Sequence, residues 1–196
     1  MDEQTVAVYD KQVADYVELT KTEKPDKTLD AFIERLPKQA YVLDLGCGPG
    51  ASAAAMKAAG LTVDAIDASG EMVRVANELF AIDAKVARFQ DIDCSYQYDG
   101  IWANFSLLHA TEDEFIDILP RLHSALKPAG LLFLGMKTGE GLSRDDLGRR
   151  YTYYSQARLT KLLAAARFEV IDTQTGEAMS LTGNIDPFVL MTFKAS

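Results

Sequence analysis

Three glycines that alternate with other residues form the part of this sequence best suited to hold a ligand. Gly46, Gly48 and Gly50 follow the apolar run at residues 41–45 and lead into an alanine-rich stretch. A residue without a Cβ lets the backbone approach a ligand closely and tolerates a positive φ in a tight turn. Such a loop between a strand and a helix is typical of nucleotide binding, and up to Ala51 it also satisfies the nicotinamide fingerprint.

Two carboxylates bear on which ligand this loop would take. Asp44 lies two residues before Gly46, where it would repel a pyrophosphate and attract an ammonium or a sulfonium group. Asp67 ends the next apolar run, seventeen residues after Gly50, where a carboxylate can accept both hydroxyls of a ribose. The alternative for Asp67 is an acid that the helix macrodipole stabilises. Together the two acids favour a cationic nucleoside over a dinucleotide.

The elements that must position these residues alternate between extended and helical segments. Apolar runs predict strands over residues 41–45, 61–67, 85–89, 98–103, 131–136, 168–172 and 188–193. Helices are predicted within residues 1–36 and over residues 50–59, 69–80 and 111–126, with one more from residue 155. This alternation predicts an α/β fold, a doubly wound sheet with helices on both faces. Only about fifteen residues without a helical period join the last two strands, so the last strand is expected to run antiparallel in a mostly parallel, seven-stranded sheet.

The composition limits the classes of protein to consider. The 196 residues fit one domain, 1–196, in which residues 1–36 form a helical cap. Acidic side chains number 29 against 20 basic ones, and the net charge of −9 disfavours nucleic acid and anionic lipid as partners. No apolar run is long enough to span a membrane, and the acidic N-terminus is not that of a secretory signal. Two cysteines predict a reducing, cytoplasmic location, and no His or Cys cluster has metal spacing, so no metal is expected.

Four motifs, in order, resemble those of the class I S-adenosylmethionine-dependent methyltransferases, over roughly residues 9–194. Asp44 and the three glycines match the first motif, whose loop holds the methionine and ribose part of the cofactor in that family. Residues 89–92 resemble the third motif and residues 98–109 the fourth. Before the fifth strand, Ala129 stands where the family usually has a glycine. The resemblance implies a Rossmann-like fold and S-adenosyl-L-methionine as the cofactor.

Cofactor contacts follow from the resemblance at each matching position. Asp67 matches the acid that binds the ribose, and Met72 matches a common neighbour of the adenine. Asp91 is the candidate for the adenine amino group, with Ile92 against the ring, and Tyr16 is a candidate contact from an N-terminal lid. The implied cofactor-binding residues are Asp44, Gly46, Cys47, Gly48, Gly50, Asp67, Ala68, Met72, Asp91, Ile92, Asn104 and Tyr16.

Methyl transfer, the reaction that the resemblance implies, depends mainly on alignment and a dry pocket. A general base helps only when the acceptor has a proton to lose. Asn104 and His109 follow the fourth predicted strand, at the edge of the sheet where a ligand would bind, and are the catalytic candidates. A loop-capping role is the alternative for Asn104, and a structural role is the alternative for His109.

Arginines and tyrosines gather after the fifth predicted strand, where they suit a carboxylate or a phosphate. Lys137, Arg149 and Tyr153 are the candidate substrate-binding residues. Tyr9, predicted to share one face of the first helix with Tyr16, is a further candidate, and core packing is the alternative for both tyrosines. The alternative is a solvated loop in which the arginines pair with neighbouring aspartates. The predicted acceptor is a small, anionic molecule.

Two other functions stay open at this level. A methyltransferase of a macromolecule, such as a tRNA base or a protein side chain, would use the arginines to hold phosphate and the tyrosines to stack on bases. A non-catalytic cofactor-binding protein or a nicotinamide oxidoreductase is the other. The acceptor atom is undefined, and a monomer or a weak homodimer is expected.

Overall fold

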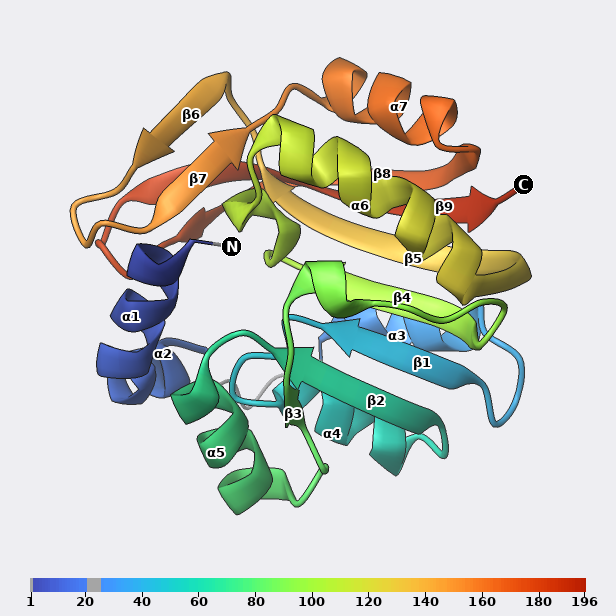
Figure 1. Ribbon diagram of the computed structural model, residues 1–196, viewed down its shortest axis with the longest axis horizontal. Helices are drawn as coiled ribbons and strands as arrows, with labels where there is room; N and C mark the ends of the chain where they lie inside the picture. The colour runs from blue at the N-terminus through green and yellow to red at the C-terminus, as the bar shows by residue number, and fades with distance from the viewer. Residues whose placement is uncertain (1, 21–25) are drawn as a thin grey trace.

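A seven-stranded sheet in the order β3-β2-β1-β4-β5-β9-β8 forms the centre of the computed structural model, which describes residues 2–20 and 26–196 (Figure 1). Its strands are β1 Tyr41–Leu45, β2 Thr62–Asp67, β3 Lys85–Val86, β4 Tyr98–Asn104, β5 Leu126–Lys137, β8 Phe168–Met179 and β9 Ile185–Ala195. β9 runs antiparallel to both of its neighbours, whereas the other neighbouring strands pair in parallel. The predicted α/β fold, a mostly parallel sheet with an antiparallel last strand, is confirmed.

Helices cover both faces of this sheet. The helices of the described residues are α1 Glu3–Lys11, α2 Val13–Thr20, α3 Lys27–Glu34, α4 Ala51–Ala58, α5 Gly70–Phe80, α6 Glu112–Ala125 and α7 Gln156–Ala165, with 3₁₀ turns at Phe89–Asp91 and Leu107–His109. α6 and α7 lie over one face, and α3, α4 and α5 lie over the other (Figure 1). Pro25, which the sequence places between two N-terminal helices, lies outside the described residues.

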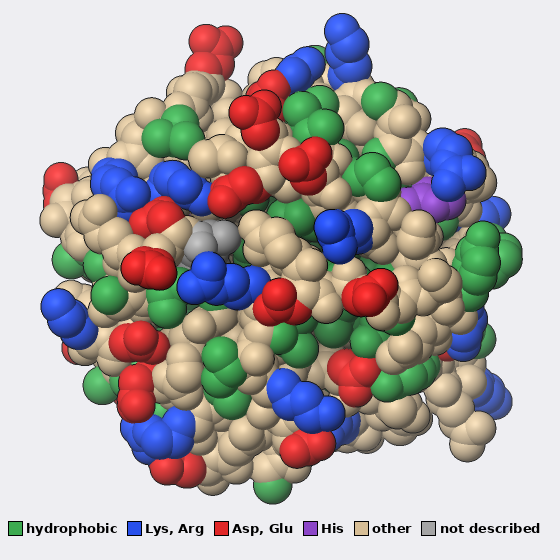
Figure 2. Space-filling view, viewed as in Figure 1, with side chains coloured by type: hydrophobic (Ala, Val, Ile, Leu, Met, Phe, Trp, Pro, Cys, Tyr) green, Lys and Arg blue, Asp and Glu red, His purple; other side chains and the backbone are tan. Residues whose placement is uncertain are grey.

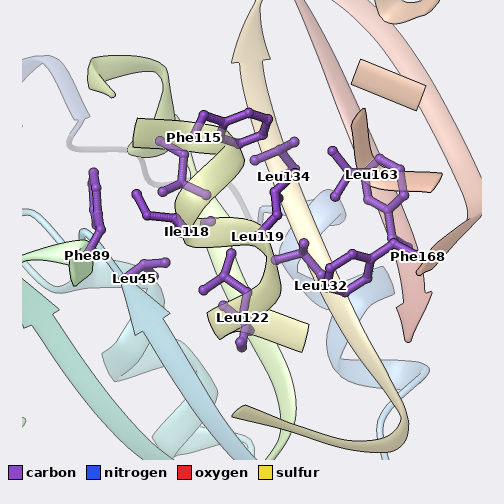
Figure 3. Close-up of a cluster of buried hydrophobic side chains, with 14 of the residues drawn as sticks. Leu45, Phe89, Phe115, Ile118, Leu119, Leu122, Leu132, Leu134, Leu163 and Phe168 are labelled. Carbon is purple, nitrogen blue, oxygen red and sulfur yellow. The ribbon is translucent and has the colours of Figure 1, made fainter. Parts of the chain in front are cut away.

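Alternate residues of each strand point to opposite faces and build two separate hydrophobic clusters. On β1, Val42 packs with α3 and α4, whereas Leu43 packs with α6. Phe115 and Leu119 of α6 and Leu163 of α7 belong to the same cluster as Leu43 (Figure 3). Each fully buried side chain of this size contributes about 1.5–3 kcal/mol, so packing on both faces holds the strand ends in fixed positions.

Polar side chains cap the N-termini of α5 and α6, as the sequence predicts. Ser69 accepts a hydrogen bond from the Met72 backbone N–H at the start of α5. Thr111 and Glu114 form a reciprocal capping box at the start of α6. Such caps satisfy backbone N–H groups that have no partner inside the helix, and each contributes about 1 kcal/mol.

Two predicted elements are wrong in the N-terminal half. Tyr9 and Tyr16 do not share one helix, because the chain leaves helical geometry at Gln12 (φ −108°, ψ 17°) between α1 and α2. Their rings nevertheless meet edge to face, with centroids 5.5 Å apart. The third strand covers only residues 85–86, because the Asp91 carboxylate takes the Arg88 backbone N–H and turns the chain into a 3₁₀ helix.

Four strands near the C-terminus also differ from the prediction: two are longer than predicted, and two are not predicted. β8 and β9 pair along their whole length, so the predicted strands at 168–172 and 188–193 are too short. We call the β8–β9 pair the ribbon. The sequence does not predict its extension, because the C-terminal end of β8 is mostly polar and has no apolar face to bury. Residues 141–144 (β6) and 150–153 (β7) form a hairpin where no strand is predicted. This hairpin lies beside α1 (Figure 1).

Candidate active site

The glycine loop leaves β1 and turns back on the end of β2. The backbone N–H groups of Gly46 and Cys47 both donate to the Ile66 carbonyl, at 2.8 and 2.9 Å. Gly46 has a φ of +78°, and a Cβ there would lie 2.3 Å from the Cβ of Ser106. Glycine at this position therefore allows the loop to pack directly against the segment that follows β4.

Asp67 fixes the loop to the start of α5. Its Oδ2 accepts the Gly48 N–H at 2.9 Å, and its Oδ1 accepts the Ser69 N–H at 2.8 Å. Burial raises the pKa of Asp67, while these backbone donors act in the opposite direction. The Ser69 hydroxyl donates to Asp10 of α1 at 2.5 Å, so α1 is attached to the same corner of the molecule.

Two buried oxygens at the mouth of the glycine loop have no donor among the described residues. They are Asp44 Oδ2 and Asn104 Oδ1, and both side chains line one cavity of about 420 Å³ together with Gly46, Cys47 and Gly48. Burial, with the nearby charge of Asp67, raises the pKa of Asp44 to about 8. A ligand with an ammonium group and hydroxyl donors satisfies both oxygens, so these residues fit the cofactor that the resemblance implies.

A narrow space next to the glycine loop is lined by eight of the seventeen predicted site residues. About 30 Å³ in volume, it is lined by Tyr9, Tyr16, Gly46, Gly48, Asp67, Met72, Asn104, Phe105, Ser106 and His109. We call this space and the adjoining cavity around Asp44 the cofactor cavity. Asp91 and Ile92 do not line it, because they face a separate cavity with Asp64 and Tyr98. Among the other predicted contacts, Gly50 is buried against Ile82 and Ala76, and Ala68 links Asp67 to Ser69.

A second cavity of about 370 Å³, here the acceptor cavity, opens beside the cofactor cavity. Its wall is mainly aromatic and aliphatic, and its lining residues are Tyr9, Tyr16, Leu19, Phe105, Leu108, Lys137, Arg149, Tyr151, Ala178, Met179, Ser180, Leu181, Asp186 and Phe188. Tyr9, Tyr16 and Phe105 line both cavities. Two adjoining cavities of this kind can hold a donor and an acceptor against each other.

Two cations line the acceptor cavity, and both have carboxylate partners. Lys137 Nζ lies 2.6 Å from Asp186 Oδ2 and 4.1 Å from the centroid of the Tyr151 ring. Arg149 is only 2% exposed and pairs with Asp145, through Nε at 2.8 Å. Its guanidinium carbon lies 5.4 Å from the ring centroids of both Tyr9 and Tyr151. The predicted pairing of arginine with a neighbouring aspartate therefore occurs at the same residue that faces the cavity.

His109 uses both of its ring nitrogens. Nδ1 lies 2.6 Å from the Arg150 carbonyl, which can only accept, so Nδ1 carries the proton. Nε2 therefore accepts from the Tyr9 hydroxyl at 2.8 Å. Burial lowers the pKa of His109 to about 3, and the charges of Arg149 and Lys137 act in the same direction. The neutral imidazole thus orients the Tyr9 hydroxyl at the wall between the cavities.

Some lining residues have no counterpart among the predicted ones. Tyr151 lines the acceptor cavity, whereas Tyr153, its predicted neighbour, packs against Gly139 instead. Alternation along an extended segment places Tyr151 on the same side as Arg149, a signal that is visible only once residues 150–153 are known to be a strand. Residues 178–181, at the end of β8 and directly after it, show no pattern in the sequence that would predict their place in the cavity lining.

The described residues contain neither a metal site nor a membrane span by geometry. In residues 2–20 and 26–196, no three His, Cys, Asp or Glu side chains lie close enough together to hold a metal ion. Over the same ranges, no helix has the length and apolarity to cross a bilayer. The site is thus built from the glycine loop, the two acids and the two adjoining cavities.

Part of this chain is similar in sequence to known proteins. Residues 42–130 match the family described as a methyltransferase domain. Malonyl-[acyl-carrier protein] O-methyltransferase of Enterobacter lignolyticus is 31% identical over 138 residues, which are 67% of this chain and 53% of that protein. Trans-aconitate 2-methyltransferase of Delftia acidovorans is 35% identical over 108 residues, 52% of this chain and 39% of that protein. This chain thus spans about half the length of the first relative, or less for the second.

A solved structure shares the fold over almost the whole chain. It is the Burkholderia thailandensis 1,6-didemethyltoxoflavin-N1-methyltransferase with bound 1,6-didemethyltoxoflavin and S-adenosylhomocysteine. The TM-score is 0.71 at 22% identity, and the match covers 97% of this chain and 88% of that one. Together with the glycine loop and its acids, these matches relate residues 42–130 to the methyltransferase-domain family. The chain as a whole has the fold of solved S-adenosylmethionine-dependent methyltransferases.

Proposed function

We propose that this chain transfers the methyl group of S-adenosyl-L-methionine to a small, anionic acceptor. The observation that supports the proposal is that the two cavities adjoin and share a wall. Unpartnered Asp44 Oδ2 and Asn104 Oδ1 line the cofactor side, and Arg149 and Lys137 line the acceptor side. An acceptor bound there would lie next to the cofactor without a further domain.

The size of the acceptor cavity supports a small molecule. At about 370 Å³ it falls at the lower end of the range for pockets that bind small ligands. The arginines that would favour RNA are already engaged: Arg144 pairs with Asp2, Arg150 with Glu114, and Arg158 with Glu112. On the face shown in Figure 2, acidic and basic side chains are interspersed. Neither feature provides the basic surface that a nucleic acid requires.

The lining of the acceptor cavity has two cations and one carboxylate, and this excess of one positive charge supports an anionic acceptor. Arg149 and Lys137 are the cationic side chains of its lining among the described residues, and guanidinium groups suit carboxylates. Two relatives are named for malonyl-[acyl-carrier protein] and trans-aconitate, and a malonyl group and aconitate both contain carboxylates. The unpaired cysteines, Cys47 and Cys94, fit the cytoplasmic location that we include in the proposal.

Calorimetry with S-adenosylhomocysteine, NADH and bulk tRNA tests this function. We expect binding of S-adenosylhomocysteine with an affinity at least about tenfold higher than that of NADH, since Asp44 Oδ2 and Asn104 Oδ1 need donors that an ammonium group supplies and a pyrophosphate lacks. We expect no mobility shift of tRNA at moderate salt. Preferential binding of NADH would support the oxidoreductase instead, and tRNA binding would support a macromolecular acceptor.

A further inference from the structure

The wall shared by the two cavities marks where methyl transfer would occur. Tyr9, Tyr16 and Phe105 line both the cofactor cavity and the acceptor cavity. A methyl group that leaves a cofactor on one side must reach an acceptor atom beside these three side chains. The groups at this wall therefore decide which kinds of acceptor atom can react.

No side chain at this wall, in the part of the chain that the structure describes, is arranged to remove a proton. Burial raises the pKa of Tyr9 and of Tyr16, so both hydroxyls keep their protons near neutral pH. His109 binds the Arg150 carbonyl through Nδ1 and the Tyr9 hydroxyl through Nε2, which leaves neither nitrogen for an acceptor. Asp67 accepts two backbone N–H groups on the cofactor side.

Beside the same wall lies a buried cation, Arg149. Its Nη1 lies 3.4 Å from the Tyr9 hydroxyl. Its Nη2 is ion-paired with Asp145 Oδ2 at 2.6 Å, although outside hydrogen-bond geometry, and the side chain is only 3% exposed. A guanidinium has five N–H donors, so it can pair with Asp145 and also donate to a carboxylate that enters the cavity.

We propose that the methylated atom is a carboxylate oxygen held by Arg149, so that the product is a methyl ester. This inference rests on the function proposed above. One carboxylate oxygen accepts a hydrogen bond from Arg149 while the other attacks the methyl carbon. The new O–C bond forms as the S–C bond breaks, and the electron pair of that bond stays on sulfur. A carboxylate is ionised at neutral pH, so no proton is removed and no base is needed.

The other charged pair of the acceptor cavity lies away from this step. Asp186 and Lys137 line the acceptor cavity but not the cofactor cavity, and they pair at 2.6 Å. They would contact a part of the acceptor remote from the methyl group. An alcohol or phenol acceptor would need a group at the shared wall that takes up its proton, which the described side chains do not provide.

Tritium transfer from S-adenosyl-L-methionine labelled in the methyl group tests this assignment. The probes are a panel of small mono-, di- and tricarboxylic acids, each with its primary amide and its primary alcohol. Alkali releases labelled methanol from a methyl ester but not from a methyl ether, amine, thioether or C-methyl group. We expect label only with acids, in an alkali-labile product. At saturating S-adenosyl-L-methionine, kcat/KM for the acid should change less than about threefold between about pH 6 and about pH 9.

Each contrary result has a distinct meaning. An alkali-stable product, faster transfer to an amide or alcohol, or no transfer to any acid by protein that binds S-adenosylhomocysteine would overturn the carboxylate assignment alone. Failure of the wild-type protein to bind S-adenosylhomocysteine would overturn the proposed function itself.

Substitutions at Arg149 test the holding group. For Arg149→Gln we expect the KM for the acid to rise at least about tenfold, because a charge-assisted hydrogen bond is lost. Arg149→Lys keeps the positive charge but loses the paired N–H donors of the guanidinium, so the KM should rise by a smaller factor. Arg158→Gln is the matched control, since Arg158 pairs with Glu112 outside both cavities. Unchanged affinity for S-adenosylhomocysteine shows that each variant is folded, and a wild-type KM in folded Arg149→Gln or Arg149→Lys contradicts the assignment.

Discussion

The cofactor cavity and the acceptor cavity are assembled from the chain in different ways. The glycine loop and its acids lie within residues 44–72, at the ends of two neighbouring parallel strands, β1 and β2. The acceptor cavity instead takes side chains from α1, α2, the end of β5, the β6–β7 hairpin and the β8–β9 ribbon. The glycine loop and its acids are therefore encoded locally, whereas the acceptor cavity depends on contacts between distant segments.

Helix α1 connects these two halves. At one end, Thr5 Oγ1 accepts the Arg150 backbone N–H at 2.9 Å, which attaches α1 to the hairpin. At the other end, Asp10 accepts from the Ser69 hydroxyl, beside Asp67. Tyr9 lies between these attachments, at the wall shared by the cavities. A change at the loop should thus affect the cofactor first, and a change at the hairpin or ribbon should affect the acceptor first.

The largest effect is expected at the loop, from Gly46→Ala. A Cβ at Gly46 would collide with Ser106, and the φ of +78° adds about 1–2 kcal/mol of strain. We expect the affinity for S-adenosylhomocysteine to fall at least about 100-fold, or about 2.7 kcal/mol, by calorimetry. Gly60→Ala is the control, because Gly60 has a φ of +87° but no heavy atom within 4 Å of an added Cβ. Equal losses in both variants would mean that strain alone, and not the packed loop, controls binding.

The next largest effect is a pH dependence that Asp44 gives to the cofactor cavity. Its pKa of about 8 lies above the ordinary value, so the folded, cofactor-free protein binds this proton more tightly than the unfolded chain. The free energy of unfolding should therefore fall as the pH rises from about 4 to about 8. A bound ammonium favours the ionised carboxylate, so cofactor affinity should rise over the upper part of this range, by up to about tenfold per pH unit.

Calorimetry in buffers of different ionisation enthalpy measures the proton released on cofactor binding. Asp44→Asn removes the titrating group and should abolish both the proton release and the slope of affinity with pH. Asp99→Asn is the control, since Asp99 pairs with Lys127 and lines neither cavity. A slope that survives in Asp44→Asn would assign the titration to another group.

The same contrast explains which features can be predicted from the sequence. The glycine loop and the Ser69 cap are short, local patterns, and their geometry depends on residues only a few positions away. The sheet follows from the alternation of strands and helices. The break at Gln12, the β6–β7 hairpin and the β8–β9 extension have no such pattern, because tertiary contacts override weak local preference there. Without these elements, Tyr151 and the ribbon residues cannot be assigned to the acceptor cavity.

A smaller effect is expected at the wall shared by the two cavities, from Tyr9→Phe. The change removes the hydroxyl that donates to His109 Nε2 at 2.8 Å and leaves that buried nitrogen without a donor. We expect kcat/KM for the acceptor to fall about tenfold, or about 1.4 kcal/mol, in steady-state assays, while affinity for S-adenosylhomocysteine changes less than about threefold. Tyr41→Phe is the control, because the Tyr41 hydroxyl donates to Asp64 outside both cavities. A larger loss of cofactor affinity than of kcat/KM would place Tyr9 in the cofactor half.

The smallest effect is expected on the acceptor side, from Lys137→Met. The methionine fills similar space but removes the cation beside Tyr151 and leaves Asp186 without its partner at 2.6 Å. Because this pair is partly exposed, we expect the KM of an anionic acceptor to rise only about fivefold, with cofactor affinity unchanged. Lys127→Met is the control at the other end of β5, where Lys127 pairs with Asp99 at 2.8 Å. An equal rise in KM for both variants would mean that the effect comes from β5 as a whole, and cofactor affinity that falls only in Lys137→Met would contradict the division of the site into two halves.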